Sequence, residues 1–218
     1  MRIPTIASAA LIMALGATLG ACNGNQTRPI ETGFGPSPDL PQPKNKLLPT
    51  VNIATAKAWT GDAKPTPAAG LSVNQFAANL DHPRWLYQLP NGDVLVAETN
   101  GPPRPEDGDG IRGFFMKRVM AKAGAGVPSA NRISLLRDAN GDGVAETHTT
   151  FLSGLNSPFG MTLVGDTLYI ADTDAIVTVP YVEGETTSSA TPETFFALPA
   201  GEINHHWTKN VIASPDGT

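Results

Sequence analysis

The sequence predicts an all-β protein built from repeated antiparallel strands. Residues 92–99 read Gly-Asp-Val-Leu-Val-Ala-Glu-Thr, and residues 165–173 read Gly-Asp-Thr-Leu-Tyr-Ile-Ala-Asp-Thr, the same pattern with one residue inserted. The 218 residues also include 22 glycines and 20 prolines, which favour turns and short strands over long helices. Repeated strand–turn–strand units are typical of the blades of a β-propeller.

Turn residues and apolar runs delimit the predicted strands in chain order. The segments expected to form strands are residues 85–89, 92–99, 131–137, 145–152, 161–164, 165–173, 176–181 and 194–198. The runs at 94–97 and 168–171 are apolar without alternation, which predicts strands covered on both faces. The sequence thus predicts two blades of a propeller within residues 71–218.

The last segment predicts the beginning of a third blade. Residues 207–213 alternate between apolar and polar side chains, and Pro215, Asp216 and Gly217 follow as a turn. This pattern is typical of a half-buried strand entering a hairpin. Because no return strand follows before Thr218, we expect the sequence to be the N-terminal part of a longer protein.

An insertion at about residues 100–130 separates the second and third predicted strands. It begins as a Gly- and Pro-rich loop, and residues 111–122 then predict a short basic amphipathic helix. We expect this helix to pack on the rim of the domain. A role at a membrane surface or in binding a partner is the alternative.

Residues 1–22 have the pattern of a bacterial export signal. Arg2 precedes an apolar run from Ile6 to Leu19, which is too short for a membrane-spanning helix. The final Leu-Gly-Ala-Cys resembles a lipobox, which implies that Cys22 is acylated and becomes the mature N-terminus. The alternative is an ordinary signal peptide cut after Ala21. Asn23 favours sorting to the outer membrane rather than the inner one, so we expect a periplasmic protein with a lipid anchor.

Composition sets the limits for the rest of the chain. Residues 23–70 are rich in proline and lack apolar periodicity, which predicts an extended tether that does not fold alone. A net charge of −5 argues against a nucleic-acid partner, because proteins that bind nucleic acids have a clustered basic face. With one cysteine, the chain cannot form an internal disulfide.

A candidate calcium loop lies between the third and fourth predicted strands. Asp138, Asn140, Asp142 and Glu146 have the oxygen-rich spacing that a hard cation prefers, and Gly143 allows the sharp bend. The full EF-hand pattern would need an acidic residue where Thr149 stands. The alternative is a plain hairpin turn with solvated carboxylates.

His205 and His206 are the candidate catalytic residues. A neutral imidazole facing a propeller channel can act as a general base. Adjacent residues on a strand point to opposite sides, so we do not expect the two histidines to bind one metal together. The alternative is a pair of polar residues at a loop–strand junction.

Three stretches together resemble the soluble glucose/sorbosone dehydrogenase family. They are residues 131–143, residues 157–161 and the stretch from His206 to Gly217, and the resemblance extends over roughly residues 71–218. The family consists of bacterial six-bladed propellers that use pyrroloquinoline quinone (PQQ) and calcium. The resemblance implies that His206 is the catalytic base and that Asn156 and His205 lie at the cofactor. Asn156 stands near the place of a cofactor-binding glutamine, and His205 replaces a usual glycine.

The resemblance therefore predicts a periplasmic quinoprotein that oxidises an aldose or a sorbosone-like aldehyde. Its expected partners are the small substrate, an electron acceptor of the respiratory chain and the membrane that holds the lipid anchor. A noncatalytic propeller lipoprotein that binds glycan or protein at the cell envelope is the alternative. A propeller lactonase would need a calcium ion held by Glu, Asn and Asp in the channel, and the sequence shows no such set.

Overall fold

The computed structural model describes residues 29–40, 53–61, 63–103, 110–201 and 206–217. The chain divides into two compact units, residues 1–51 and 52–218. In the first unit the described secondary structure is a 3-10 turn, η1 (Ile30–Gly33), within the predicted tether. The predicted signal segment with Cys22 lies outside the described residues. No described helix is long and apolar enough to cross a membrane.

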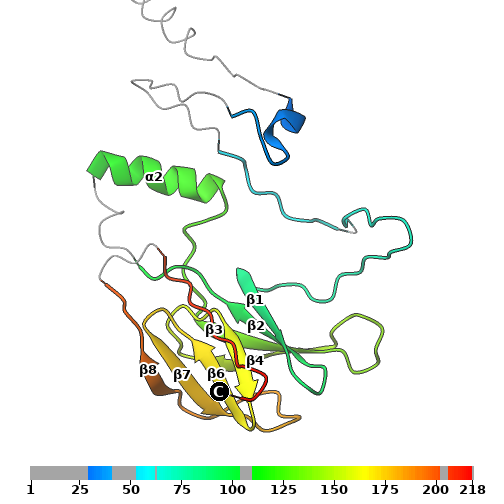
Figure 1. Cartoon of the computed structure of the whole chain (residues 1–218), viewed down its shortest axis with the longest axis vertical. Helices are drawn as coiled ribbons and strands as arrows, with labels where there is room; N and C mark the ends of the chain where they lie inside the picture. The colour runs from blue at the N-terminus through cyan, green and yellow to red at the C-terminus, as the bar shows by residue number, and fades with distance from the viewer. Residues whose placement is uncertain (1–28, 41–52, 62, 104–109, 202–205, 218) are drawn as a thin grey trace, which may run out of the picture. The chain divides into compact units, whose positions relative to one another are not determined.

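The second unit begins with a four-stranded antiparallel sheet, called sheet A here. Its strands follow one another in space as in sequence, in the order β1-β2-β3-β4 (Figure 1). Their bounds are Pro83–Gln88 for β1, Val94–Glu98 for β2, Arg132–Arg137 for β3 and Thr147–Ser153 for β4. Residues 89–93 form the turn between β1 and β2, and the longer loop 138–146 joins β3 to β4; both contain an Asn-Gly pair, as predicted for hairpin connections.

A second sheet with the same simple order, sheet B, follows in the chain. Its strands are β5 (Met161–Val164), β6 (Thr167–Ala171), β7 (Ala175–Pro180) and β8 (Glu193–Ala197). All eight strands lie within about two residues of the predicted segments. The predicted all-β class is therefore confirmed, with a single helix in the described insertion.

The hydrophobic core joins the two sheets. Its members include Leu95, Leu135 and Phe151 from sheet A, and Leu168 and Ile170 from sheet B. Strand β2 is buried along almost its whole length, as its apolar run predicts, and in the second predicted run, in β6, three of the four residues are buried and Tyr169 is half-buried. By contrast, β8 is exposed throughout and forms a sheet edge.

Hydrogen bonds also hold the two sheets together. The backbone N–H of Leu163 donates to the hydroxyl of Tyr87 at 3.0 Å. Before β5, the backbone N–H of Ser157 donates to the side-chain oxygen of Asn131, which precedes β3. The start of β5 therefore lies at the same end of the fold as the starts of β1 and β3. We call this the Pro83 end, and the opposite end the Asp93 end.

The predicted helix is present as α2 (Gly110–Lys122) (Figure 1). It ends at Lys122, and two residues later Gly124 has a φ of +73°, a conformation that glycine adopts without strain. The expected packing of its apolar face is wrong, because Ile111 is 80% exposed and Phe115 61% exposed. Apolar and basic side chains share the sides of this helix, so no continuous apolar stripe is available for packing.

The predicted third-blade strand at 207–213 is also wrong, because the described backbone there is not in a sheet. The segment makes one backbone hydrogen bond to the region of β5, from Gly160 N–H to the Lys209 carbonyl at 3.0 Å. A strand requires a ladder of such bonds. The turn that follows is confirmed, since Gly217 N–H donates to the Ser214 carbonyl at 2.9 Å.

Candidate functional site

Glu98, at the Pro83 end of β2, is a fully buried carboxylate with a complete set of partners. Arg132 on β3 donates to both of its oxygens, at 3.0 and 2.8 Å. The Ser134 hydroxyl and the backbone N–H of Asp81 also donate to it. Burial raises the pKa of Glu98, but these hydrogen bonds outweigh burial and hold the pKa below its ordinary value. Glu98 therefore acts as a structural anion at this end of sheet A.

Asp172 is the counterpart of Glu98 in sheet B. It follows β6 as Glu98 ends β2, and one of its oxygens accepts the backbone N–H of Asn156 at 2.9 Å. The other oxygen is buried and has no hydrogen-bond partner among the described residues, and the hydroxyl of Ser157 is in the same situation. Burial raises the pKa of Asp172 to about 6; the Asn156 N–H opposes this shift and the charge of Asp174 adds to it.

Strand pairing explains why Asp172 lacks the partners of Glu98. Glu98 pairs with Arg132, and Val96 pairs with Ser134. Ile170 in sheet B pairs with Val177, which therefore takes the place of Ser134. Two residues earlier, Ala175 takes the place of Arg132. Replacing an arginine and a serine by alanine and valine leaves the second carboxylate without its donors.

Asn156 and the segment carrying His206 meet at this same corner. The Asn156 carbonyl accepts the backbone N–H of Thr173 at 2.9 Å. The Thr173 hydroxyl donates to the carbonyl of Trp207 at 3.3 Å, and Trp207 is buried. His206 is exposed beside it, and Lys209 Nζ donates to the His206 carbonyl at 3.4 Å. His205 lies outside the described residues.

Aromatic side chains and an arginine gather around Trp207. The Phe159 ring lies 5.2 Å from Trp85 and 6.4 Å from Trp207, measured between ring centroids. The guanidinium carbon of Arg84 lies 5.9 Å from the Phe159 centroid and 5.4 Å from the Trp207 centroid. These residues come from three separate stretches of the chain, and sequence reasoning did not identify Arg84 or Phe159 as members of one site.

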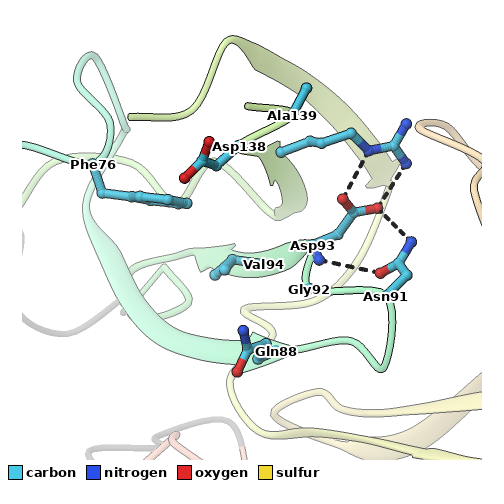
Figure 2. A pocket seen from close by; sticks show the side chains of 9 residues that line it. Phe76, Gln88, Asn91, Gly92, Asp93, Val94, Asp138 and Ala139 are labelled. Carbon is cyan, nitrogen blue, oxygen red and sulfur yellow. Dashed lines mark hydrogen bonds and ion pairs between the residues drawn. The ribbon is translucent and has the colours of Figure 1, made fainter. Parts of the chain in front are cut away.

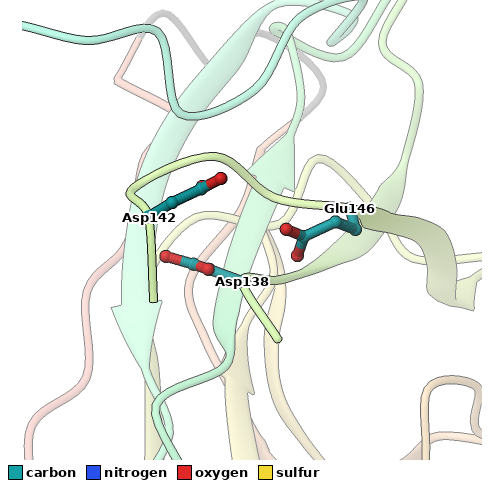
Figure 3. Close-up of side chains that lie close together, drawn as sticks. All are labelled: Asp138, Asp142 and Glu146. Atoms are coloured by element: carbon teal, nitrogen blue, oxygen red, sulfur yellow. The ribbon is translucent and has the colours of Figure 1, made fainter. Parts of the chain in front are cut away.

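The predicted calcium loop places its carboxylates together. Oxygen atoms of Asp138, Asp142 and Glu146 lie within 4.8 Å of one another (Figure 3). Hydrogen bonds from the backbone N–H groups of Gly143 and Gly141 hold the pKa of Asp138 below its ordinary value. The side chain of Asn140 donates to Glu146 at 2.5 Å. Carboxylates grouped in this way fit a hard cation, and they also form a closed network of hydrogen bonds without one.

A cavity of about 510 Å³ lies next to this loop, at the Asp93 end of sheet A. Asp93 on its wall is buried and accepts two hydrogen bonds of 2.7 Å from Arg137. The hydrogen bonds from Arg137, and a further one from Asn91, hold the pKa of Asp93 below its ordinary value against the effect of burial. Figure 2 shows Asp93 and Asn91 among the residues that line the cavity. Arg137 also donates to the Gly184 carbonyl of the β7–β8 loop, so this ion pair links sheet A to a loop of sheet B.

The structure therefore separates the two predicted sites. Asn156 and the His206 segment lie at the Pro83 end, whereas the loop of Asp138, Asn140, Asp142 and Glu146 lies at the Asp93 end. Strands of five to seven residues lie between the two ends, which corresponds to roughly 20 Å. A cation in the loop would therefore not touch a ligand beside His206.

Comparison with known proteins identifies the family but not a function. A family model described as a domain of unknown function (DUF7133) matches residues 68–218. Neither the search of curated proteins nor the search of solved structures found a match. The match spans both sheets, α2 and the His206 segment, and it covers more than half of the chain. The protein therefore belongs to the DUF7133 family.

Proposed function

We propose that the two sheets are consecutive blades of a β-propeller in a PQQ-dependent dehydrogenase that oxidises an aldose or a sorbosone-like aldehyde. Four antiparallel strands in sequence order are what one propeller blade requires, and two such sheets share one core. The fold alone does not select a function, because propellers support many. The proposal therefore depends on the corner around Trp207 and on the resemblance of the sequence.

The observation that carries the proposal is the convergence of Asn156 and His206 on one corner. They are fifty residues apart in sequence, and Thr173 links the Asn156 carbonyl to the Trp207 carbonyl through two hydrogen bonds. Trp85 and Phe159, which are half-buried, provide flat apolar surfaces in the same corner, next to the buried ring of Trp207. Such surfaces suit a planar aromatic cofactor such as PQQ.

His206 would act as the general base of the reaction. Its side chain is exposed, so it can reach a hydroxyl of a sugar or of an aldehyde hydrate. His206 takes the proton of that hydroxyl group while a hydride leaves the carbon atom that carries the hydroxyl. PQQ, when bound, supplies the acceptor for that hydride. Lys209 holds the His206 carbonyl and so helps to position the base.

Calcium would bind in the loop of Asp138, Asn140, Asp142 and Glu146 and would stabilise the fold rather than take part in the redox step. Calcium should raise the melting temperature of the full-length protein, and Asp142→Asn should reduce that increase. Glu185→Gln is the matched control, because Glu185 is an exposed carboxylate on another turn. An equal calcium response in the wild type and Asp142→Asn would contradict this assignment.

The protein would be held in the periplasm by lipid on Cys22, more often at the outer membrane, and would pass electrons to an acceptor of the respiratory chain. Cys22→Ser should move the protein from the membrane fraction to the soluble periplasmic fraction. An unchanged membrane fraction would contradict the lipid anchor.

The direct test of the enzyme proposal is reconstitution of the full-length protein with PQQ and calcium. Reduction of an artificial electron-accepting dye is measured with glucose, other aldoses and sorbosone, and the protein without PQQ is the control. PQQ-dependent dye reduction with at least one of these substrates is expected. If none is oxidised, the proposal fails.

The exposed apolar side chains of α2 favour a second candidate, a noncatalytic lipoprotein that binds protein or glycan at the envelope. Ile111, Phe114 and Phe115 are all more than half exposed in the described helix. Exposed aromatic side chains of this kind mark interaction surfaces. This candidate takes precedence if the reconstituted protein is inactive.

A further inference from the structure

Arg84 lies between two aromatic rings at the Pro83 end of sheet A. Its guanidinium carbon is 5.9 Å from the centroid of Phe159 and 5.4 Å from that of Trp207. The two rings are nearly perpendicular, at 88°. Contact with two ring faces restricts the orientation of a guanidinium group, because each face attracts the cation. We call these three residues the Arg84 shelf.

The guanidinium of Arg84 has unused hydrogen-bonding capacity. An arginine has five N–H donors, and among the described residues none of those of Arg84 takes part in a hydrogen bond or an ion pair. Arg132 and Arg137, in contrast, each donate two hydrogen bonds to a buried carboxylate. Arg84 therefore has the same donor groups as these two arginines, but among the described residues it has no carboxylate partner.

The surroundings of Arg84 favour an anion. Lys209 follows Trp207 by two residues and is half-buried, and its amino group donates only to the His206 carbonyl among the described residues. Asp81, close to Arg84 in sequence, is already paired with Arg132 at 2.7 Å. Asp172 is connected to this corner through Thr173, but its carboxylate is buried. Among the described residues, two cations thus lie at an aromatic cluster in which Phe159 is half-buried and Trp207 is buried.

We propose that Arg84 binds a carboxylate group of a planar aromatic ligand whose ring lies against the Arg84 shelf. A guanidinium fork matches the two oxygens of a carboxylate, and the half-buried ring of Phe159 offers accessible surface for the flat body of the ligand. The identity of the natural ligand as PQQ, which carries carboxylates on an aromatic ring system, rests on the proposed function. The recognition of an aromatic carboxylate by Arg84 does not.

Binding is measured on the full-length protein by quenching of tryptophan fluorescence, since Trp207 forms part of the shelf. The probes are PQQ and benzene-1,3,5-tricarboxylate, which has the carboxylates and the ring but no quinone. Arg84→Gln should weaken binding of both probes by about 10- to 100-fold, the usual effect of losing hydrogen bonds to a charged group. Arg84→Lys keeps the charge without the planar fork and should give an intermediate loss.

Arg118→Gln is the matched control. Arg118 also stacks on an aromatic ring, 4.9 Å from the centroid of Phe114, but it belongs to α2 rather than to the shelf. This variant should bind both probes as the wild type does. Arg84 is exposed, so its variants should keep the wild-type melting temperature, and that measurement separates lost binding from lost folding.

The inference and the proposed function fail in different ways. If the tricarboxylate binds in an Arg84-dependent manner but no sugar is oxidised with PQQ, the inference stands and the enzyme proposal fails. If PQQ supports sugar oxidation and Arg84→Gln has wild-type affinity for both probes, the inference is overturned and the enzyme proposal stands. Absence of binding by the wild type, or equal weakening by Arg84→Gln and Arg118→Gln, also overturns the inference.

Discussion

Glu98 and Asp172 occupy equivalent positions in the two sheets, but only Glu98 is paired with an arginine. Glu98 is the last residue of β2 and Asp172 directly follows β6, and both accept a backbone N–H from the segment that leads into the first strand of the same sheet. Arg132 and Ser134 complete the first site, whereas Ala175 and Val177 stand at the corresponding places in the second. The same position is therefore stabilising in one sheet and costly in the other.

Asp172→Asn should change the pH dependence of stability. The folded pKa of Asp172, about 6, lies above its ordinary value of 3.8, so the wild type loses stability as the pH rises through this interval. The loss should be roughly 1–3 kcal/mol between pH 4 and pH 7. Denaturant unfolding of both proteins at several pH values measures it. If the free energies of unfolding of the wild type and Asp172→Asn differ by the same amount at every pH between 4 and 7, the raised pKa is contradicted.

Glu98→Gln should destabilise the protein, with the opposite dependence on pH. It leaves Arg132 without its buried partner, which should cost roughly 2–4 kcal/mol because Arg132 is partly exposed. The pKa of Glu98 is lowered, so its contribution is present at neutral pH and lost as the pH falls through the folded pKa. Urea unfolding at pH 7 and at acidic pH measures both effects.

Asp81→Asn is the control for that variant. Asp81 contacts the same arginine from the solvent side, with a side chain that is 71% exposed. Exposed ion pairs contribute little, so the loss should be about 0–1 kcal/mol. Equal losses for the Asp81 and Glu98 variants would show that burial of Glu98 does not determine the energy of this network.

Gly160→Ala should displace the segment that carries His206. A β-carbon at this position would lie 2.0 Å from the side-chain oxygen of Asn210 and 2.7 Å from its α-carbon. The backbone contact cannot be relieved by rotating a side chain, so the segment must move. Loss of burial should shift the fluorescence of Trp207 to longer wavelength. An unchanged emission spectrum in a folded variant would contradict the close contact.

Asn210→Ala in the Gly160→Ala background provides a second comparison. It removes the oxygen that would meet the new methyl group but keeps the α-carbon. The spectrum should therefore return only partly toward that of the wild type. Complete recovery would show that the side chain of Asn210 is the whole obstacle.

The strands could be predicted because each depends on local sequence. The turn at Asn91-Gly92 and the apolar run after it define β2, and the repeat at 165–173 defines β6 in the same way. The exposure of α2 could not be predicted, because the sequence of a helix with mixed apolar and basic residues does not indicate whether another part of the protein packs against it. The segment at 207–213 alternates as a strand does, but alternation does not supply a hydrogen-bonding neighbour.

The site was predicted only in part. His206 and Asn156 were identified by resemblance, and the structure brings the Asn156 corner and the His206 segment together. Arg84 and Phe159 were missed because they lie 75 residues apart in sequence and only tertiary packing joins them. Asp172 could have been found by aligning the sequences of the third strands of the two sheets as well as those of the second strands. That alignment matches Ala175 with Arg132 and shows that Asp172 lacks the arginine that pairs with Glu98.

The central claim is that His206 is the base of a PQQ-dependent oxidation, and the most direct measurement is the turnover rate of His206→Ala. The full-length protein is reconstituted with PQQ and calcium, and oxidation of an aldose or sorbosone is followed by dye reduction. His206→Ala should lower the rate by about 10²–10⁴-fold with PQQ affinity unchanged, and His205→Ala should lower it less. A wild-type rate in His206→Ala, or a rate abolished only by His205→Ala, would contradict the assignment.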